Sequence, residues 1–300
     1  MNPDGAAAAR TIALPDGEVA ARLAPGADPD GQGLVLLAHA TGLNKDAYAP
    51  FVAALRSAAP VLSFDMRGHG RTTLPADPRG LRSWRTYAED TAAVAEAVRA
   101  EAGEGGPTLI GHSMGALAVL LAAASGTACR RLILIEPVVL PKAARLVAHS
   151  PLRAPLILRR GIAASAGRRT ARFPSREAAR TRYAQTPFFK TWQGGALEGY
   201  LAAGLTEDKE RGGVRLACDP AWEAATFAAQ AHSFWRPLAR VRRAGVPVTV
   251  IRANRGSTLP PWATQRLVDR GVTLRRVTGP HVLCQANPEG TAGAVREALS

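Results

Sequence analysis

The sequence predicts an α/β protein built on a doubly wound, mostly parallel sheet of eight strands. Three observations carry this prediction. Short apolar runs, typical of strands buried on both faces, alternate along the chain with helix-forming segments. An Asp-Gly turn near the N-terminus predicts an antiparallel hairpin at one edge of the sheet. The alternation stops after Pro137 and returns near Val246, which indicates an insertion within one large domain.

The first six strands follow from apolar runs in the N-terminal half of the chain. Two of these runs flank Pro15-Asp-Gly17 and are expected to form the hairpin, and residues 1–10 before them are expected to be disordered. The six runs are residues 11–14, 18–23, 34–38, 61–64, 108–110 and 131–135. The helices expected between them are residues 44–57, 83–102 and 116–125.

The C-terminal part of the chain is expected to supply the last two strands, each followed by a helix. These four elements are residues 246–251, 261–270, 272–277 and 288–299. Residues 11–137 and 232–300 are therefore predicted to form the core that holds the sheet. Residues 138–231 show helical patterns without a convincing central strand. We expect them to form a helical cap at the carboxyl edge of the sheet, where such folds bind ligands.

The composition limits the partners that we expect. The formal net charge of +14 is carried almost entirely by arginine, and no basic tract is interleaved with aromatic residues as in a platform for single-stranded nucleic acid. No apolar run approaches the length of a membrane span, and the N-terminus lacks the pattern of a signal peptide. The expectation is a cytoplasmic protein that binds neither nucleic acid nor membrane. Three widely spaced cysteines predict reduced thiols, with no disulfide and no zinc site.

One segment is markedly basic. Residues 137–182 contain eleven Lys and Arg residues and a single acid, Glu177. A solvated helical face is the simpler interpretation. The alternative is a surface that attracts an anionic substrate or an acidic carrier protein.

A nucleophile is predicted within Gly111-His-Ser-Met-Gly115. An apolar strand precedes this pentapeptide and a helix-forming run follows it, which is the context of a Gly-x-Ser-x-Gly nucleophile elbow. Ser113 would then lie at a helix N-terminus, where developing negative charge is favoured. A serine hydroxyl needs a base within hydrogen-bond reach and a third group that orients the base. Of the six histidines, only His281 follows the last strand, so His281 is the predicted base.

These features together resemble the α/β-hydrolase fold superfamily. Besides the elbow and Gly279-Pro-His281, the resemblance rests on residues 37–42 (Leu-Ala-His-Ala-Thr-Gly) and 65–70 (Asp-Met-Arg-Gly-His-Gly). It implies that two backbone N–H groups, those of Met114 and Thr41, form an oxyanion hole.

Ala40 stands where the superfamily usually has glycine, and it is the alternative donor to the oxyanion hole. His39, Ala40 and His112, together with Trp192 of the expected cap, are candidates for a substrate pocket.

The acid departs from the superfamily pattern. The resemblance implies an Asp after the seventh strand, but residues 252–260 contain no carboxylate. Glu136 ends the sixth strand, and haloalkane dehalogenases are similar in carrying their acid at that position. We therefore predict Glu136 as the acid, with Asn254 and Ser257 as hydrogen-bonding groups in the vacated site. Asp65 is the alternative, although an anchor for its own turn is the simpler role.

The predicted function is that of a serine hydrolase that cleaves a carboxylic ester of a small or medium apolar substrate through an acyl-enzyme. It would need no cofactor and no metal, because neither metal-ligand spacing nor a dinucleotide loop is present, and it would act as a monomer or homodimer. A thioesterase, an acyltransferase and a lactone-forming or lactone-cleaving enzyme of a metabolite pathway are the alternatives. A non-catalytic ligand-binding protein of the same fold is the third class.

Overall fold

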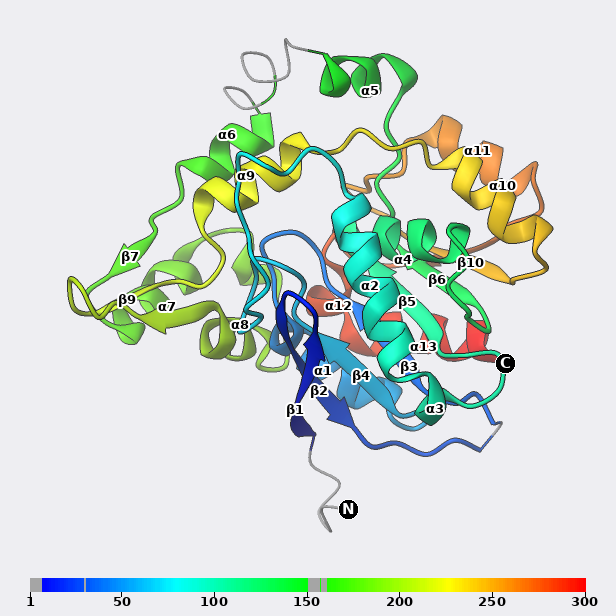
Figure 1. The fold of residues 1–300 in the computed structure, drawn as a ribbon, viewed down its shortest axis with the longest axis horizontal. Coiled ribbons are helices and arrows are strands. Elements are labelled where there is room, and N and C mark those ends of the chain that lie inside the picture. Colours follow the sequence, from blue (N-terminus) through cyan, green and yellow to red (C-terminus); the bar gives the residue numbers. More distant parts are fainter. Residues whose placement is uncertain (1–6, 30, 151–156, 158–160) are drawn as a thin grey trace.

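An eight-stranded sheet forms the centre of the protein (Figure 1). The computed structural model describes residues 7–29, 31–150, 157 and 161–300. The strands follow the order β1-β2-β4-β3-β5-β6-β10-β11, and only the pairs β1–β2 and β2–β4 are antiparallel. Their bounds are β1 Ala8–Leu14, β2 Gly17–Ala24, β3 Val35–Ala38, β4 Val61–Phe64, β5 Thr108–His112, β6 Leu132–Ile135, β10 Val248–Ala253 and β11 Thr273–Val277. The predicted fold class is confirmed.

Helices cover both faces of the sheet because successive strand residues point to opposite sides. Leu36 and Leu109 belong to the core on one face, whereas Leu37 and Ile110 belong to the core on the other. The first core is covered by α2 (Arg85–Ala97), α4 (Met114–Ala124), α10 (Trp235–Arg243) and α11 (Pro261–Val268). The second is covered by α1 (Ala49–Leu55), α12 (Leu283–Ala286) and α13 (Pro288–Leu299). Two short helices, η1 (Lys45–Tyr48) and α3 (Arg99–Ala102), complete this part of the chain.

The segment between β6 and α10 contains helices and a small second sheet. Its helices are α5 (Lys142–His149), α6 (Gly161–Gly167), α7 (Arg176–Gln185), η3 (Phe189–Thr191), α8 (Ala196–Gly204) and α9 (Pro220–Ala228). Its sheet has the order β7 (Arg172–Phe173), β9 (Val214–Leu216), β8 (Leu205–Glu207). The expected helices are present and none of the described strands of this segment joins the central sheet, but the small second sheet was not expected, because strands of two or three residues are too short to show alternation. Its aromatic residues pack mainly on one another, as Tyr183 does on Phe189 and Tyr200.

Two further predictions concern the N-terminal residues 1–10 and the basic segment, residues 137–182. Residues 8–10 are not disordered but extend β1, while residues 1–6 lie outside the described residues. Within the basic segment, Arg153, Arg159 and Arg160 also lie outside the described residues. Four of its other arginines form ion pairs with acids later in the same insertion: Arg169 with Glu223, Arg172 with Asp208, Arg176 with Glu207 and Arg180 with Glu198.

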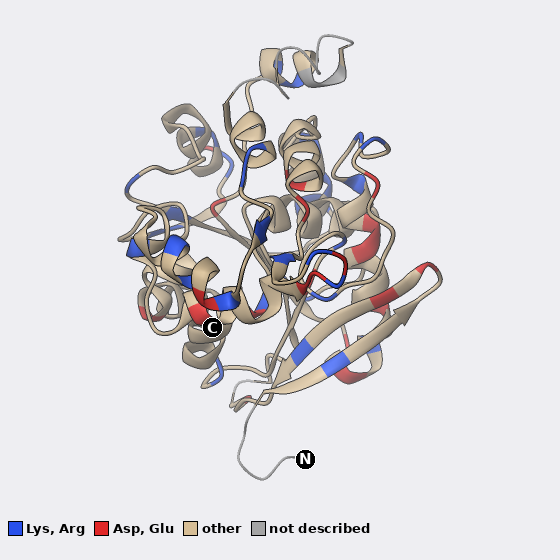
Figure 2. Cartoon of the chain, turned by 90° about the vertical axis from the view of Figure 1, so that its left-hand side faces the viewer, with Lys and Arg blue, Asp and Glu red and all other residues tan. Residues whose placement is uncertain are grey.

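Figure 2 shows charges of both signs interspersed on the face that carries the β1–β2 hairpin. The three cysteines, Cys129, Cys218 and Cys284, are free thiols in the interior. Across the described parts of the chain, no helix has both the length and the apolarity needed to cross a bilayer.

Candidate active site

The predicted elbow is a sharp turn between β5 and α4 with Ser113 at its apex. Ser113 has φ 56° and ψ −111°, a conformation that residues with a side chain rarely adopt. A Cβ at Gly111 would lie 2.3 Å from the carbonyl oxygen of Gly115, and a Cβ at Gly115 would lie 2.3 Å from that of Ala38. Only glycine permits these close approaches, so the two glycines allow the turn that holds Ser113 at the start of α4.

His281 reaches Ser113 from the loop after β11. Its Nε2 atom lies 3.1 Å from Ser113 Oγ, and its Nδ1 atom lies 2.9 Å from Glu136 Oε2. The side chain of His281 is 27% exposed, whereas that of Glu136 is fully buried. The structure thus brings Ser113, His281 and Glu136 together at the distances over which a base can accept the proton of a hydroxyl group.

Glu136, like Ser113, has a positive φ. Its φ is 49°, and among the described residues these two are the only non-glycine residues with a positive φ. The Glu136 N–H group donates to the carbonyl of Ile251 at 2.8 Å, next to the parallel pairing of β6 with β10. Such conformations cost about 1–3 kcal/mol each and concentrate at functional sites. The strain therefore marks the same two residues that the motif and the missing loop carboxylate had indicated.

Four donors hold the buried carboxylate of Glu136. Oε1 accepts from Ala253 N and from Ser257 Oγ, each at 2.7 Å. Oε2 accepts from Thr258 N at 3.0 Å and from His281 Nδ1 at 2.9 Å. Every lone-pair direction of the carboxylate therefore faces a donor, which is what a buried negative charge requires.

These bonds keep Glu136 ionised. Burial by itself would raise its pKa, but the hydrogen bonds from His281, Ser257 and Ala253 outweigh burial and hold the pKa below its usual range. An ionised Glu136 can only accept, so Nδ1 of neutral His281 carries the proton. The Nε2 atom of His281 is then the acceptor that faces the hydroxyl of Ser113.

The superfamily pattern places a carboxylate in the loop after β10. In this protein the same loop carries neutral hydrogen-bonding groups instead. Ser257 and Asn254 both form hydrogen bonds here, but only Ser257 bonds to Glu136. Asn254 Oδ1 instead accepts from Gly279 N at 2.9 Å and so fixes the loop that leads to His281. Thr258 was not predicted, yet its backbone N–H binds Glu136 Oε2 and its hydroxyl donates to Glu136 O at 3.0 Å. The one sequence signal for Thr258 is its place in a loop without a carboxylate.

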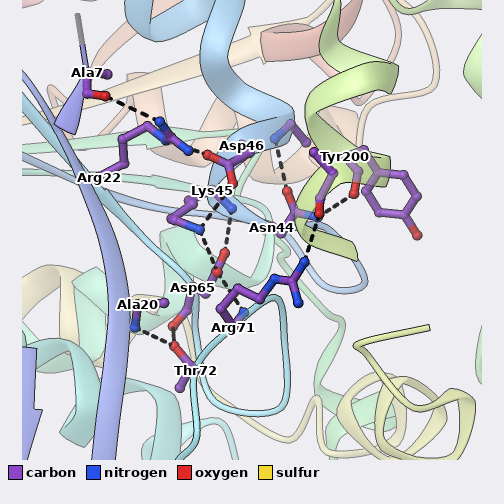
Figure 3. A network of polar contacts seen from close by, with 12 residues as sticks. Ala7, Ala20, Arg22, Asn44, Lys45, Asp46, Asp65, Arg71, Thr72 and Tyr200 are labelled. Carbon is purple, nitrogen blue, oxygen red and sulfur yellow. Dashed lines mark hydrogen bonds and ion pairs between the residues drawn. The ribbon is translucent and has the colours of Figure 1, made fainter. Parts of the chain in front are cut away.

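Asp65 binds elsewhere and does not orient His281. Its carboxylate accepts from Lys45 N at 2.8 Å, from Lys45 Nζ at 2.9 Å and from Arg71 N at 2.9 Å (Figure 3). Lys45 Nζ also contacts Asp46 at 3.1 Å. Asp65 thus joins the turn after β4 to the start of η1, which is the anchoring role that its position suggested.

The expected oxyanion loop, residues 39–42, is fixed by its neighbours. Ala40 N donates to Tyr48 Oη at 2.9 Å, and Gly42 N donates to His69 Nε2 at 3.0 Å. Because the amide of Ala40 is already bonded to Tyr48, Thr41 remains the candidate donor of this loop to the expected oxyanion hole. Met114, the other expected donor, is the first residue of α4 and follows Ser113 directly.

Two of the expected pocket residues are buried structural groups. His39 is 1% exposed; its Nδ1 donates to Ala40 O at 2.8 Å and its Nε2 accepts from Met66 N at 2.9 Å. His112 is 0% exposed and both of its ring nitrogens are also bonded. Ala40, at 5% exposed, is buried as well, and the lining of a substrate pocket by these three residues stays a prediction.

The fourth expected pocket residue, Trp192, lies on the surface near the His281 loop. It is half-buried and packs edge-on against Tyr200. It also borders a hollow that includes Gly279 and Pro280.

Tyr48 and His112 connect the loop of residues 39–42 to His281. His112 Nε2 lies 3.0 Å from the carbonyl oxygen of His281, which can only accept, so this nitrogen carries the proton. His112 Nδ1 must then accept from Tyr48 Oη, 2.6 Å away, while Tyr48 Oη itself accepts from Ala40 N. The direction of every bond in this chain is fixed. Sequence reasoning missed Tyr48 because a buried tyrosine has the pattern of an ordinary core residue.

The insertion between β6 and α10 touches the same loop. A Cβ at Gly42 would lie 2.5 Å from Glu223 Oε1, so the carboxylate of Glu223 packs directly on this glycine. Arg169 pairs with Glu223 and donates to Tyr200 Oη at 2.6 Å and to Tyr183 Oη at 3.0 Å. Burial opposes the charge on Arg169, but Tyr200 and Glu223 raise its pKa above the usual value.

This arrangement can perform nucleophilic chemistry with side chains alone. It contains an oriented hydroxyl, a partly exposed imidazole and a buried carboxylate in one hydrogen-bond chain. In the parts of the chain that the structure describes, no three His, Cys, Asp or Glu side chains gather as a set that could hold a metal ion.

Comparison with known proteins identifies the class. The sheet order, the elbow and the histidine loop are those of an α/β hydrolase. The model of the alpha/beta hydrolase family matches residues 35–294, and the chain belongs to this family. No curated protein matches the sequence.

Several solved structures share the fold over nearly the whole chain. An E-2-(acetamidomethylene)succinate hydrolase is 20% identical with a TM-score of 0.75, covering 97% of this chain and 98% of its own. A thioesterase domain from the curacin biosynthetic pathway is 18% identical with a TM-score of 0.75, covering 98% and 99%. A peroxisomal alpha-beta-hydrolase from Saccharomyces cerevisiae is 18% identical with a TM-score of 0.74, covering 98% and 88%. At such identities the similarity shows the fold alone.

The low pKa values of three buried histidines predict that the folded protein loses stability as the pH falls. Burial lowers the pKa of His39 to about 4 and those of His69 and His112 to about 3. In the unfolded chain the same groups take up protons below about pH 6.5. The stability they contribute is present above that pH and falls as the pH drops toward their folded pKa values, by about 1.4 kcal/mol per pH unit for each histidine. Urea unfolding between about pH 7 and pH 5 measures this slope before carboxylates titrate, and a flat profile there would contradict it.

Tyr48→Phe should destabilise the protein and slow the reaction of Ser113 with a fluorophosphonate probe. It leaves Ala40 N–H and His112 Nδ1 buried without partners, at a cost of about 1–3 kcal/mol for each group. Tyr87→Phe is the matched control, because its partner Thr226 Oγ1 retains a bond to Trp222 O. Urea unfolding and labelling rates of the two variants should differ. Equal values for both would show that the Tyr48 hydroxyl has no special role.

Proposed function

We propose that this protein is a serine hydrolase that cleaves carboxylic esters of small or medium apolar compounds through an acyl-enzyme. The observation that supports the proposal most strongly is the unbroken hydrogen-bond chain from Glu136 through His281 to Ser113. Each member has the protonation state that the reaction needs, because ionised Glu136 keeps the Nδ1 proton on His281 and leaves Nε2 free to accept.

The reaction proceeds in two half-reactions. His281 Nε2 takes the proton of Ser113 Oγ as the oxygen attacks the ester carbonyl, and the N–H groups of Met114 and Thr41 stabilise the resulting oxyanion. The alcohol leaves with the proton from His281 and the acyl group stays on Ser113. Water then attacks the acyl-enzyme and gives a proton to His281, which returns it to Ser113 as the carboxylic acid departs.

Residues 138–231 are proposed to act as a cap that selects the substrate, and the contact of Glu223 with Gly42 supports this role. A thioesterase or acyltransferase is the second candidate, because the same acyl-enzyme serves a thioester and because the fold is shared with a thioesterase domain. Lactone formation or cleavage would use the same groups. A cytoplasmic location and action on a small molecule complete the proposal.

The test is turnover of a panel of aryl esters, lactones and acyl thioesters. Ser113→Ala should abolish turnover, and Glu136→Gln should lower kcat/KM by about 10⁴, because His281 would lose the group that fixes its tautomer. Glu104→Gln, a change of the same type at an exposed residue, is the control and should leave the rate unchanged.

Near-wild-type turnover by Glu136→Gln would remove Glu136 from the mechanism. Failure of a fluorophosphonate probe to label Ser113 in the folded protein would favour a non-catalytic binding protein. Preference for thioesters over aryl esters would replace the esterase by the second candidate.

A further inference from the structure

A groove of about 880 Å³ crosses the helical face formed by α2, α4 and α10. Figure 1 shows α4 between the other two helices. The groove is lined by Leu121, Ala122 and Ala124 at the C-terminal end of α4, whereas Ser113 precedes the N-terminal end of this helix. It is therefore a surface separate from the candidate active site.

The groove has an apolar floor and a basic rim. Buried small residues, among them Ala88 and Ala122, form the floor. The rim is formed by exposed arginines from three helices and the turn after α11, and Glu89 is the acid among the lining residues. These arginines are Arg85, Arg236, Arg240, Arg243, Arg266 and Arg270.

The rim arginines lack acidic partners within the described chain. Elsewhere arginines form ion pairs, such as Arg67 with Asp90 and Arg10 with Glu101. On the rim, by contrast, Arg240 donates to the carbonyl of Ala124, and none of the six pairs with a carboxylate of a described residue. These six arginines, with Arg145 as a further lining cation and Glu89 as the acid among the lining residues, produce a positive local potential around the groove.

Two of these arginines oppose the stability of their own helices. Arg85 is the first residue of α2 and Arg236 the second of α10, and neither helix has an acid in its first turn. The helix dipole makes a cation at a helix N-terminus unfavourable, by about 0.3–1 kcal/mol. A local conflict of this kind indicates that the charges serve a purpose outside the helix.

The groove fits a polypeptide better than a nucleic acid. Arg266 and Arg270 cover the ring of Trp235 at 4.5 and 5.4 Å from its centroid, so this ring is not available to stack on a base. A phosphate backbone would also leave the alanine floor without an apolar partner. The groove continues into a hollow of about 250 Å³ at Arg236, where Leu146 adds an apolar side chain that is 62% exposed.

We propose that this groove docks an amphipathic helix of a partner protein, with its apolar face on the alanine floor and its acidic flanks on the arginine rim. The proposal assigns an acidic partner to the groove formed by α2, α4 and α10. The expectation from the sequence places such a partner on residues 137–182, where several arginines are already paired; of that segment, Lys142, Arg145 and Leu146 border the groove or its adjoining hollow. The proposal does not depend on the proposed hydrolase activity.

The test uses a fluorescein-labelled synthetic peptide that carries leucine and alanine on one helical face and glutamate on the other. Fluorescence anisotropy compares it with a scrambled peptide of the same composition and with an oligo-dT of equal charge. The groove variant is Arg85→Glu with Arg236→Glu, which puts an acid in two first turns and so favours both helices. The matched control, Arg79→Glu with Arg211→Glu, has the same net charge and changes exposed residues outside the groove.

The amphipathic peptide should bind the wild type more tightly than the scrambled peptide does. The groove variant should bind it at least tenfold more weakly, and the control should remain within about twofold of the wild type, because a local rim and not net charge would carry the affinity. Equal losses in both variants, tighter binding of the oligo-dT, or no binding of the peptide to the wild type would each overturn the proposal.

Discussion

The buried carboxylate of Glu136 is the interaction on which the candidate site depends. It accepts four hydrogen bonds, from the end of β10, from two residues of the loop that follows and from His281. A buried charge without such partners would cost several kcal/mol, and the donors without the carboxylate would be equally unsatisfied. The negative charge of Glu136 therefore helps to fix both the conformation of the loop after β10 and the position of His281.

The sheet explains why an acid from β6 can occupy a site that belongs to the next strand. Because β6 and β10 are parallel neighbours, their carboxyl ends meet at one edge. The positive φ of Glu136 turns the chain at that edge, and its side chain reaches Ala253 and Thr258. On the other side of Ser113, Tyr48 and His112 link the loop of residues 39–42 to the backbone of His281. Both sides of the nucleophile are thus fixed by buried groups.

The sequence predicts much of this fold because buried parallel strands are short apolar runs and the elbow has fixed spacing. The absence of a carboxylate from residues 252–260, together with the resemblance to proteins that carry their acid at the end of the sixth strand, indicates Glu136. Other features have no local signature. The backbone strain at Glu136 comes from tertiary contacts, the strands of the second sheet are too short to alternate, and Tyr48 resembles any core residue. The burial of the His39 and His112 rings has no local signature either, because a histidine in a motif does not reveal whether its ring is buried.

The tautomer of His281 tests the central claim most directly. In ¹⁵N-histidine NMR spectra above about pH 8, where an ordinary imidazole is neutral, the ring signals of His281 can be assigned by comparison with His281→Gln. The account predicts a protonated Nδ1, with its proton shifted downfield by the bond to Glu136, and an unprotonated Nε2. A neutral His281 that carries its proton on Nε2 would contradict it.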